Sequence, residues 1–266
     1  MTILQAILLG ALQGATEFFP VSSSGHLVVM RVFFGIQEPP VLFDVLLHVP
    51  TLIVVVLVFR SRIGKICMSF YRWVRGYSLP PDQENVRLLL WLVCASLATV
   101  GIGLGLSFAL EAVRTSHRIV SILFFATGLI LVATIFARGR KGYLQMSFWD
   151  ALIIGCAQGL GVLPGVSRSG ITISASLVRD LDREQAGEFA FLLAIPAIVG
   201  AVALNAGEAG VLLDQVDPLV LAAGCGASFV VGLASLAFLL MVVKRGRLHL
   251  FSVYLLPLAI LTFILF

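Results

Sequence analysis

A polar motif occurs twice in a chain that is otherwise strongly apolar. The first copy reads QGATEFFPVSSSGH over residues 13–26, and the second reads QGLGVLPGVSRSG over residues 158–170. The segments that follow also correspond, because FDVLLHVP at 43–50 aligns with FAFLLAIP at 189–196 in the same register. A repeated motif of this kind predicts two halves of one membrane protein, each carrying half of a site.

The composition requires lipid as the solvent for most of the surface. Of the 266 residues, 59% are hydrophobic and only 12% are charged, and the mean hydropathy is +1.06. We therefore predict an all-α integral membrane protein. The four cysteines stand singly without metal-ligand spacing, so we interpret them as small hydrophobic residues.

Six stretches are apolar over the length of about 20 residues that a membrane helix needs. They are approximately 41–60, 87–108, 117–137, 185–206, 217–243 and 249–266. The two motif segments, about 2–35 and 148–179, are instead pairs of short apolar runs broken by Pro, Gly and Ser. Irregular backbone at membrane depth persists only where protein or water satisfies it, which predicts re-entrant helical hairpins lining a cavity.

The predicted architecture is a single membrane domain, residues 1–266, with an internal repeat over 1–140 and 146–266. Each half then contains one hairpin and three membrane spans. Because three is an odd number, the second half is inverted relative to the first. The fold class is therefore six transmembrane helices plus two re-entrant helical hairpins in an inverted-topology repeat, with the hairpins approaching each other from opposite faces.

The positions of the charges predict the orientation. Most of the 18 basic residues fall in alternate loops, within 60–87, 138–141, 179–183 and 244–247. The remaining loops are acidic or mixed and include Glu38 and Asp217. By the positive-inside rule the basic loops face the cytoplasm, so both termini face outward. The net charge of +4 is then explained by the basic residues of the cytoplasmic loops, and we expect no nucleic-acid partner.

Two polar residues in the first hairpin share one helix face, because Gln13 and Glu17 are four residues apart. A carboxylate within a membrane segment costs about 2.5 to 3.5 kcal/mol, which proteins offset with a function or a paired charge. We expect Glu17 to point into a cavity. The alternative is an interfacial glutamate near the chain end that simply reaches water.

The serine run after Pro20 is typical of a helix start that binds an anion. Ser22, Ser23 and Ser24 are candidate N-cap residues, and the free N–H groups of a helix start attract phosphate. In a helix beginning near Ser23, that residue and His26 lie three apart on one face, within range for a nucleophile and its base. Alternatively, these small residues only allow close helix packing in lipid, although this does not explain the histidine.

The second copy has Arg168 where the first has the central serine of its run. Arginine keeps its charge in proteins and presents a planar set of donors that matches phosphate oxygens. A salt bridge to Glu17 and a bound phosphate are the two alternatives, and both can hold in turn. The surrounding donors Ser167, Ser169 and Gly170 favour the phosphate. His48, beside Pro50, is interpreted as a hydrogen-bonded core histidine.

The strings QGATEFFPVSSSGH (13–26) and PGVSRSG (164–170) resemble the two defining motifs of the bacitracin-resistance type undecaprenyl-diphosphate phosphatases. The length, span pattern and paired hairpins are similar to that family over nearly the whole chain. The resemblance implies a multi-pass hydrolase of the bacterial inner (plasma) membrane, which converts the lipid substrate undecaprenyl diphosphate to the monophosphate. It also implies a divalent cation, Mg²⁺ or Ca²⁺, and a homodimer is compatible with it.

Transferred to this chain, the resemblance implies that Glu17 and Gln13 form the acidic, metal-binding motif. It implies Ser23 as the nucleophile and His26 as its acid or base partner, and the Arg168 segment as the phosphate clamp. The neutral amide of Gln13 weakens a two-carboxylate metal site. A further departure is His48-Val49-Pro50, where relatives often carry Gln and Gly.

Two questions remain open from the sequence, one about the mechanism and one about the function. The serine of the first motif attacks the terminal phosphorus to form a covalent intermediate, or water activated by His26 attacks it directly. The second question concerns function. A polyprenyl-phosphate flippase with inverted repeats needs the same phosphate-binding residues, so the sequence also allows a transporter. The pairing of Ser23 with His26 favours the hydrolase, since a carrier needs donors but neither a nucleophile nor a base.

Overall fold

The computed structural model describes residues 2–34, 41–205 and 217–265, and these are almost entirely helical. Glu38, used above to predict orientation, lies outside the described residues. The helices are α1 (Ile3–Phe18), α2 (Ser23–Phe34), α3 (Val41–Val58), α4 (Arg60–Val74), α5 (Asp82–Thr115), α6 (His117–Ala133), α7 (Phe148–Leu160), α8 (Arg168–Val178), α9 (Arg183–Asn205), α11 (Pro218–Lys244) and α12 (Ser252–Leu265). Short 3₁₀ turns cover Thr134–Phe136, Tyr143–Gln145 and Leu248–Phe251.

The predicted membrane spans agree with the structure. Five helical segments are long and apolar enough to cross a membrane, and they contain α5, α6, α9, α11 and α12. A sixth is obtained by counting α3 with α4, two helices that meet at an angle of 68°. The all-α multi-pass fold is therefore confirmed.

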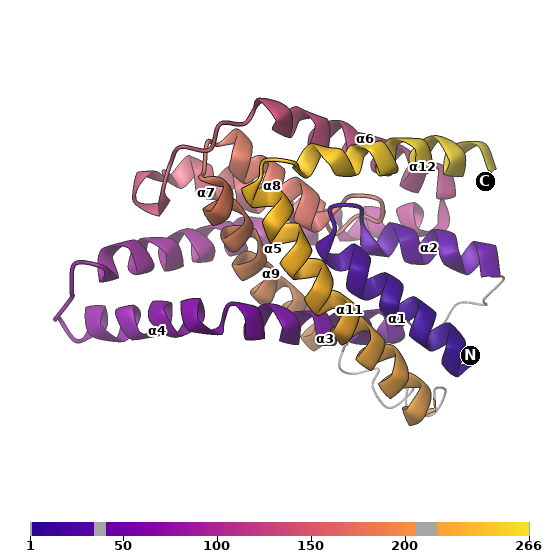
Figure 1. Cartoon of the computed structure of the whole chain (residues 1–266), viewed down its shortest axis with the longest axis horizontal. Helices are drawn as coiled ribbons and strands as arrows, with labels where there is room; N and C mark the ends of the chain where they lie inside the picture. Colours follow the sequence, from indigo (N-terminus) through magenta and orange to yellow (C-terminus); the bar gives the residue numbers. More distant parts are fainter. Residues whose placement is uncertain (1, 35–40, 206–216, 266) are drawn as a thin grey trace.

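The two motif segments form pairs of short helices, as predicted. The first pair, α1 and α2, is interrupted after Phe18, and the second pair, α7 and α8, is interrupted after Leu160. α1 begins at the N-cap Thr2 and α7 at the N-cap Ser147; each cap side chain accepts a backbone hydrogen bond from the first turn. Figure 1 shows α1 starting and α12 ending at one end of the molecule, opposite the turn between α4 and α5.

Glycines set how closely the hairpins pack on the spans. α1 packs along α11, and a Cβ at Gly10 or Gly14 would overlap the backbone carbonyl of Gly224 or Ser228. α7 packs along α5 in a similar way, because a Cβ at Gly155 would overlap the backbone of Ala95. Small residues four apart allow helix backbones to approach closely in membranes. This close packing holds α1 against α11 and α7 against α5.

Replacing Gly14 by alanine should destabilise the protein by about 1 to 3 kcal/mol, since the new methyl group overpacks a backbone contact. The measurement is thermal or chemical unfolding of the purified protein in detergent. Gly103→Ala is the matched control, because nothing lies within 4 Å of a Cβ at Gly103. Equal stability of the two variants would contradict the close packing of α1 on α11.

Candidate active site at the two hairpin tips

The first hairpin tip is built by a sharp reversal between α1 and α2. The chain passes through Pro20 to Ser22, which has a φ of +71° although it is not a glycine. Left-handed backbone at such a residue is strained by about 1 to 3 kcal/mol and is typical of functional sites. The reversal places Glu17, in the last turn of α1, beside Ser23 at the start of α2.

The second tip is held by its own cap and by α6. Ser167 is the N-cap of α8, and its Oγ accepts a hydrogen bond of 3.1 Å from the N–H of Gly170. From α6, the buried Thr127 hydroxyl donates to the carbonyl of Gly165 (3.0 Å) and accepts from the N–H of Ser167 (3.3 Å). Arg168 therefore begins α8 at a position fixed by hydrogen bonds.

The two tips contact each other directly. The N–H of Gly165 donates to Ser22 Oγ at 3.0 Å, and Ser169 Oγ donates to the carbonyl of Phe19 at 3.3 Å. There is no room for a side chain at Gly25, where a Cβ would lie 2.6 Å from the ring of Phe124. The expectation that the two motifs converge is confirmed, and the contact brings the serines of both tips to one place.

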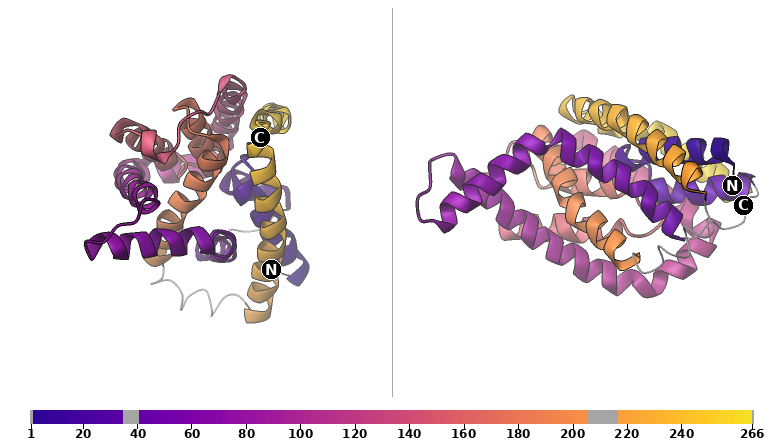
Figure 2. Two further views of the ribbon diagram at one scale, coloured as in Figure 1. Left: turned by 60° about the vertical axis from the view of Figure 1, so that its left-hand side comes forward. Right: turned by 90° about the horizontal axis from the view of Figure 1, so that it is seen from below.

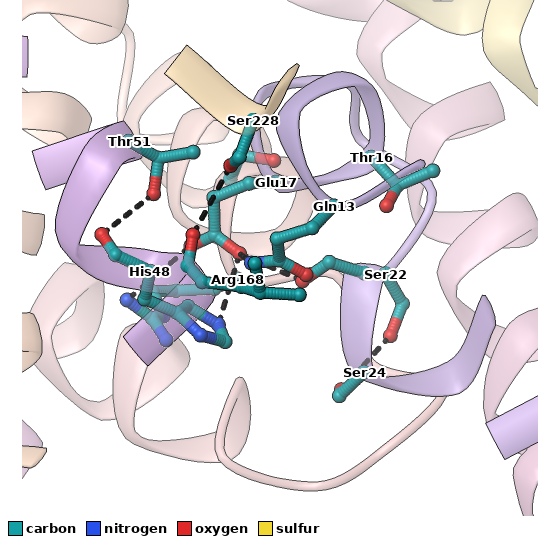
Figure 3. A network of polar contacts seen from close by, with 12 residues as sticks. Gln13, Thr16, Glu17, Ser22, Ser24, His48, Thr51, Arg168 and Ser228 are labelled. Atoms are coloured by element: carbon teal, nitrogen blue, oxygen red, sulfur yellow. Dashed lines mark hydrogen bonds and ion pairs between the residues drawn. The ribbon is translucent and has the colours of Figure 1, made fainter. Parts of the chain in front are cut away.

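Glu17 is the centre of the polar contacts between the tips (Figure 3). Its Oε2 accepts hydrogen bonds from Ser23 Oγ at 2.7 Å and from Gln13 Nε2 at 3.0 Å. The same oxygen lies 3.2 Å from Nε2 of His48, on α3. The carboxylate is thus buried and partnered, so the alternative of a glutamate that only reaches water is wrong.

Arg168 faces the other oxygen of the same carboxylate. Its Nη1 lies 3.7 Å from Glu17 Oε1, which makes a loose ion pair. This buried nitrogen has no hydrogen-bond partner among the described residues. A buried guanidinium donor without a hydrogen bond is costly, so the arrangement favours an additional anion. Arg168 was predicted to pair with Glu17 or with a phosphate. The ion pair with Glu17 is present, and Nη1 remains as a hydrogen-bond donor for a phosphate.

His26 makes other contacts than the one we expected with Ser23. Its Nδ1 lies 2.8 Å from the carbonyl oxygen of Ser22, and its Nε2 lies 2.8 Å from the hydroxyl of Tyr254 on α12. Both ring nitrogens are therefore occupied, while Ser23 donates to Glu17. In this structure the group that accepts the hydrogen bond of the serine is the carboxylate of Glu17, and the roles of Glu17 and His26 in proton transfer stay predictions.

His48 is the site residue whose place the sequence interpretation missed. It was interpreted as a core histidine, but it contacts Glu17 and lines the same cavity as Ser23 and Arg168. A signal was present in the repeat, because His48 aligns with Ala194 when FDVLLHVP is placed on FAFLLAIP. A polar residue in one copy at a position that is apolar in the other indicates a role specific to that copy.

A cavity of about 160 Å³ lies at the meeting point of the tips. Its polar lining includes Glu17, Ser22, Ser23, Ser24, Ser167 and Arg168. Ser24 Oγ lies 3.5 Å from Ser22 Oγ, and Ser167 Oγ lies 3.2 Å from Ser169 Oγ. The same cavity also has an apolar lining, which includes Val162 and Ile198. A phosphate with an apolar tail matches this combination of polar and apolar surface.

A larger groove of about 600 Å³ lies elsewhere, between α4 and α5. Its charged side chains largely pair with one another, since Arg72 binds Asp82 and Arg62 contacts Glu84. It contains neither motif. We therefore place the active site at the hairpin tips rather than in the larger groove.

The residues at the tips fit a divalent cation that the substrate helps to bind. Within the parts of the chain that the structure describes, no three His, Cys, Asp or Glu side chains gather to form a complete metal site. Glu17 supplies one carboxylate, and Gln13 Oε1 is a buried oxygen without a hydrogen-bond partner. Mg²⁺ commonly binds through one or two carboxylates together with substrate phosphates, so this incomplete set is adequate.

The fold and site define a multi-pass membrane protein with a serine, a carboxylate and a guanidinium gathered between two broken helices. The chain belongs to the family described as bacitracin resistance protein BacA, whose profile matches residues 6–261. It is 45% identical over 260 residues to an undecaprenyl-diphosphatase of Treponema denticola, covering 98% of this chain and 96% of that protein. An undecaprenyl-diphosphatase of Carboxydothermus hydrogenoformans is 39% identical over 258 residues, covering 96% and 94% respectively.

Proposed function

We propose that this protein hydrolyses undecaprenyl diphosphate to undecaprenyl phosphate and phosphate, which recycles the lipid carrier of cell-wall synthesis. The observation that carries the proposal is the 2.7 Å hydrogen bond from Ser23 to Glu17, with Arg168 on the other side of that carboxylate. A carrier needs no hydroxyl activated by a carboxylate. The relatives named undecaprenyl-diphosphatase support the hydrolase in preference to a flippase.

Substrate binding follows from the donors that surround the cavity. Arg168 and the serines of both tips bind the terminal phosphate, and the starts of α2 and α8 add N–H groups and positive helix ends. The apolar lining accepts the first part of the polyprenyl tail, whose remainder stays in lipid. The phosphate is thus held beside Ser23 before any bond changes.

The chemical step uses the hydroxyl of Ser23. Its Oγ forms a bond to the terminal phosphorus while the bond from that phosphorus to the bridging oxygen breaks, releasing undecaprenyl phosphate. The serine proton passes to Glu17 Oε2, with which the hydroxyl already has a hydrogen bond. Water then attacks the phosphoserine and releases inorganic phosphate, with Glu17 returning the proton to Ser23.

Two neighbours hold the Glu17 carboxylate for this step. Gln13 Nε2 donates to Oε2, and His48 Nε2 lies 3.2 Å from the same atom. They act as positioning residues, because they orient the carboxylate oxygen that faces Ser23.

A divalent cation, Mg²⁺ or Ca²⁺, is part of the proposal. Glu17 and Gln13 Oε1 are the residues that would hold it together with the diphosphate. When bound, it would neutralise charge on the diphosphate in addition to the contribution of Arg168.

The location is inferred from the family, and the orientation from the positions of the charges. We place the protein in the bacterial plasma membrane, with the basic loops in the cytoplasm and both termini outside. The homodimer and the inverted internal repeat stay predictions of the sequence.

Purified protein in detergent should release phosphate from undecaprenyl diphosphate when Mg²⁺ or Ca²⁺ is present, because detergent micelles permit hydrolysis but no transport. A colorimetric phosphate assay measures the release, and a chelator should abolish it. Ser23→Ala protein prepared identically controls for contaminating phosphatases. The absence of release with metal present would contradict the hydrolase and favour the carrier.

A further inference from the structure

Helix α4 differs in direction from the membrane spans. It follows α3 at an angle of 68°, so it runs much closer to the membrane plane than α3 does. The left view of Figure 2 looks nearly along α6 and α12, and α4 lies across that view at the edge of the molecule. One face of α4 is packed, through the buried Ile66 and Ser69, and the rest is exposed.

The exposed part of α4 carries an apolar stripe with helical spacing. Cys67, Phe70, Tyr71 and Val74 occupy positions i, i+3, i+4 and i+7, and all four are exposed. Trp73, which is 51% exposed, lies one turn beyond Ser69 on the face of α4 that carries Ile66 and Ser69. A water-facing helix has no reason to display this stripe, whereas a helix at the boundary between headgroups and acyl chains does.

The charges on α4 have one sign. Four of its fifteen residues are basic, the C-cap residue Arg75 is also basic, and none is acidic. The four within the helix are Arg60, Arg62, Lys65 and Arg72. Two of the five basic residues pair with acidic side chains, since Arg62 binds Glu188 and Arg72 binds Asp82. The other three form no salt bridge among the described residues and are exposed.

The depth of α4 is set by its contacts with the start of α5. Ser69 donates to Asp82 and accepts from Asn85. The first strongly exposed apolar residue of α5 is Leu90, five to eight residues later, which corresponds to about 8 to 12 Å along a helix. The headgroup region on one side of the bilayer is about 5 to 8 Å thick, so this part of α4 lies at the outer side of the headgroups rather than far out in the solvent.

We propose that α4 is an interfacial helix that binds acidic phospholipid headgroups. Its apolar stripe enters the acyl boundary of the leaflet at this end of the molecule, and Arg60, Lys65 and Arg75 attract the lipid phosphates. Positive charge, an exposed aromatic-rich stripe and a near-planar direction together select an acidic lipid surface as the occupant. This binding surface is separate from the hairpin tips.

Spin labelling of Cys67 tests the position of the stripe. The other three cysteines are replaced by serine or alanine, and the full-length protein is reconstituted into vesicles containing phosphatidylglycerol. The label should collide mainly with oxygen dissolved in lipid and little with a water-soluble nickel reagent. Ser61→Cys, exposed about 120° around α4 from Cys67 and lining the groove between α4 and α5, is the matched control and should show the reverse. A Cys67 label open to the nickel reagent, or shielded from both reagents by a second protein, overturns the proposal.

Charge removal tests the preference for acidic lipid. The retention of phosphatidylglycerol relative to phosphatidylcholine on purified protein should fall by roughly fivefold for each charge lost in Arg60→Gln and Arg75→Gln. Arg140→Gln, whose side chain is 70% exposed but already pairs with Asp180, is the control for general loss of charge. Hydrolysis in detergent should stay unchanged, which separates this surface from the active site. Unchanged retention in the double variant overturns the proposal.

Discussion

Ser23→Ala should reduce phosphate release by about a thousandfold or more, which is the largest loss expected of any single change in this protein. Alanine removes the only atom that the proposed mechanism joins to phosphorus, while the small side chain preserves the start of α2. The donor lost to Glu17 is one of four groups around that carboxylate, so the tips should stay assembled. The measurement is the rate of phosphate release from undecaprenyl diphosphate under saturating substrate.

Ser24→Ala is the control for this result. Ser24 lines the same cavity, but its hydroxyl contacts only Ser22 Oγ, at 3.5 Å, among the described residues. Its loss should lower activity by no more than about tenfold, mainly through weaker substrate binding. Substantial turnover by Ser23→Ala would rule out the covalent path. It would instead favour direct attack by water, with His26 or Glu17 as the base.

Much of the fold was predictable because lipid imposes simple rules on sequence. Long apolar runs predict the spans, and short apolar runs separated by Pro, Gly and Ser predict the two hairpins. The bend of 68° between α3 and α4 was not predicted. It occurs where the apolar run ends and arginines begin at Arg60, but the direction of the following helix depends on packing against α5, which no local pattern reports.

The contacts within the site were less predictable than its location. Spacing placed Ser23 and His26 on one face, yet the imidazole contacts Tyr254, a residue 228 positions away in the chain. The left-handed backbone at Ser22 turns Ser23 toward Glu17, and a reversal of that kind is not encoded in helical periodicity. His48 was overlooked because a single histidine in an apolar span is usually structural.

The two motif copies share residues but not chemistry. Gln13 bonds to Glu17, whereas its counterpart Gln158 donates to the carbonyl of Leu193 on α9 and to the hydroxyl of Thr99 on α5, so it ties three helices together. The position equivalent to Glu17 in the second copy is Val162. The first tip therefore supplies the carboxylate and the serine, and the second supplies the guanidinium. Neither tip is a complete site, which explains why the contact between them is so closely fitted.

Glu17→Gln should reduce turnover by about 10²- to 10⁴-fold, because an amide occupies the same space but cannot accept the proton of Ser23. The loss should appear mainly in kcat. Substrate binding should persist, since the amide oxygen can still contact the cation while Arg168 loses a competing anion and keeps its donors for phosphate. Steady-state kinetics that separate kcat from KM provide the measurement.

His48→Gln is the graded comparison for Glu17→Gln. A glutamine at this position retains an N–H donor that can reach the carboxylate, so the orientation of Glu17 survives and the loss should stay within about tenfold. His48→Ala removes the donor and should lose more. Near-normal turnover by Glu17→Gln would contradict the carboxylate as base and return that role to His26. A loss in His48→Gln equal to that in Glu17→Gln would mean that the imidazole itself carries the proton, since only then is the ring chemistry indispensable.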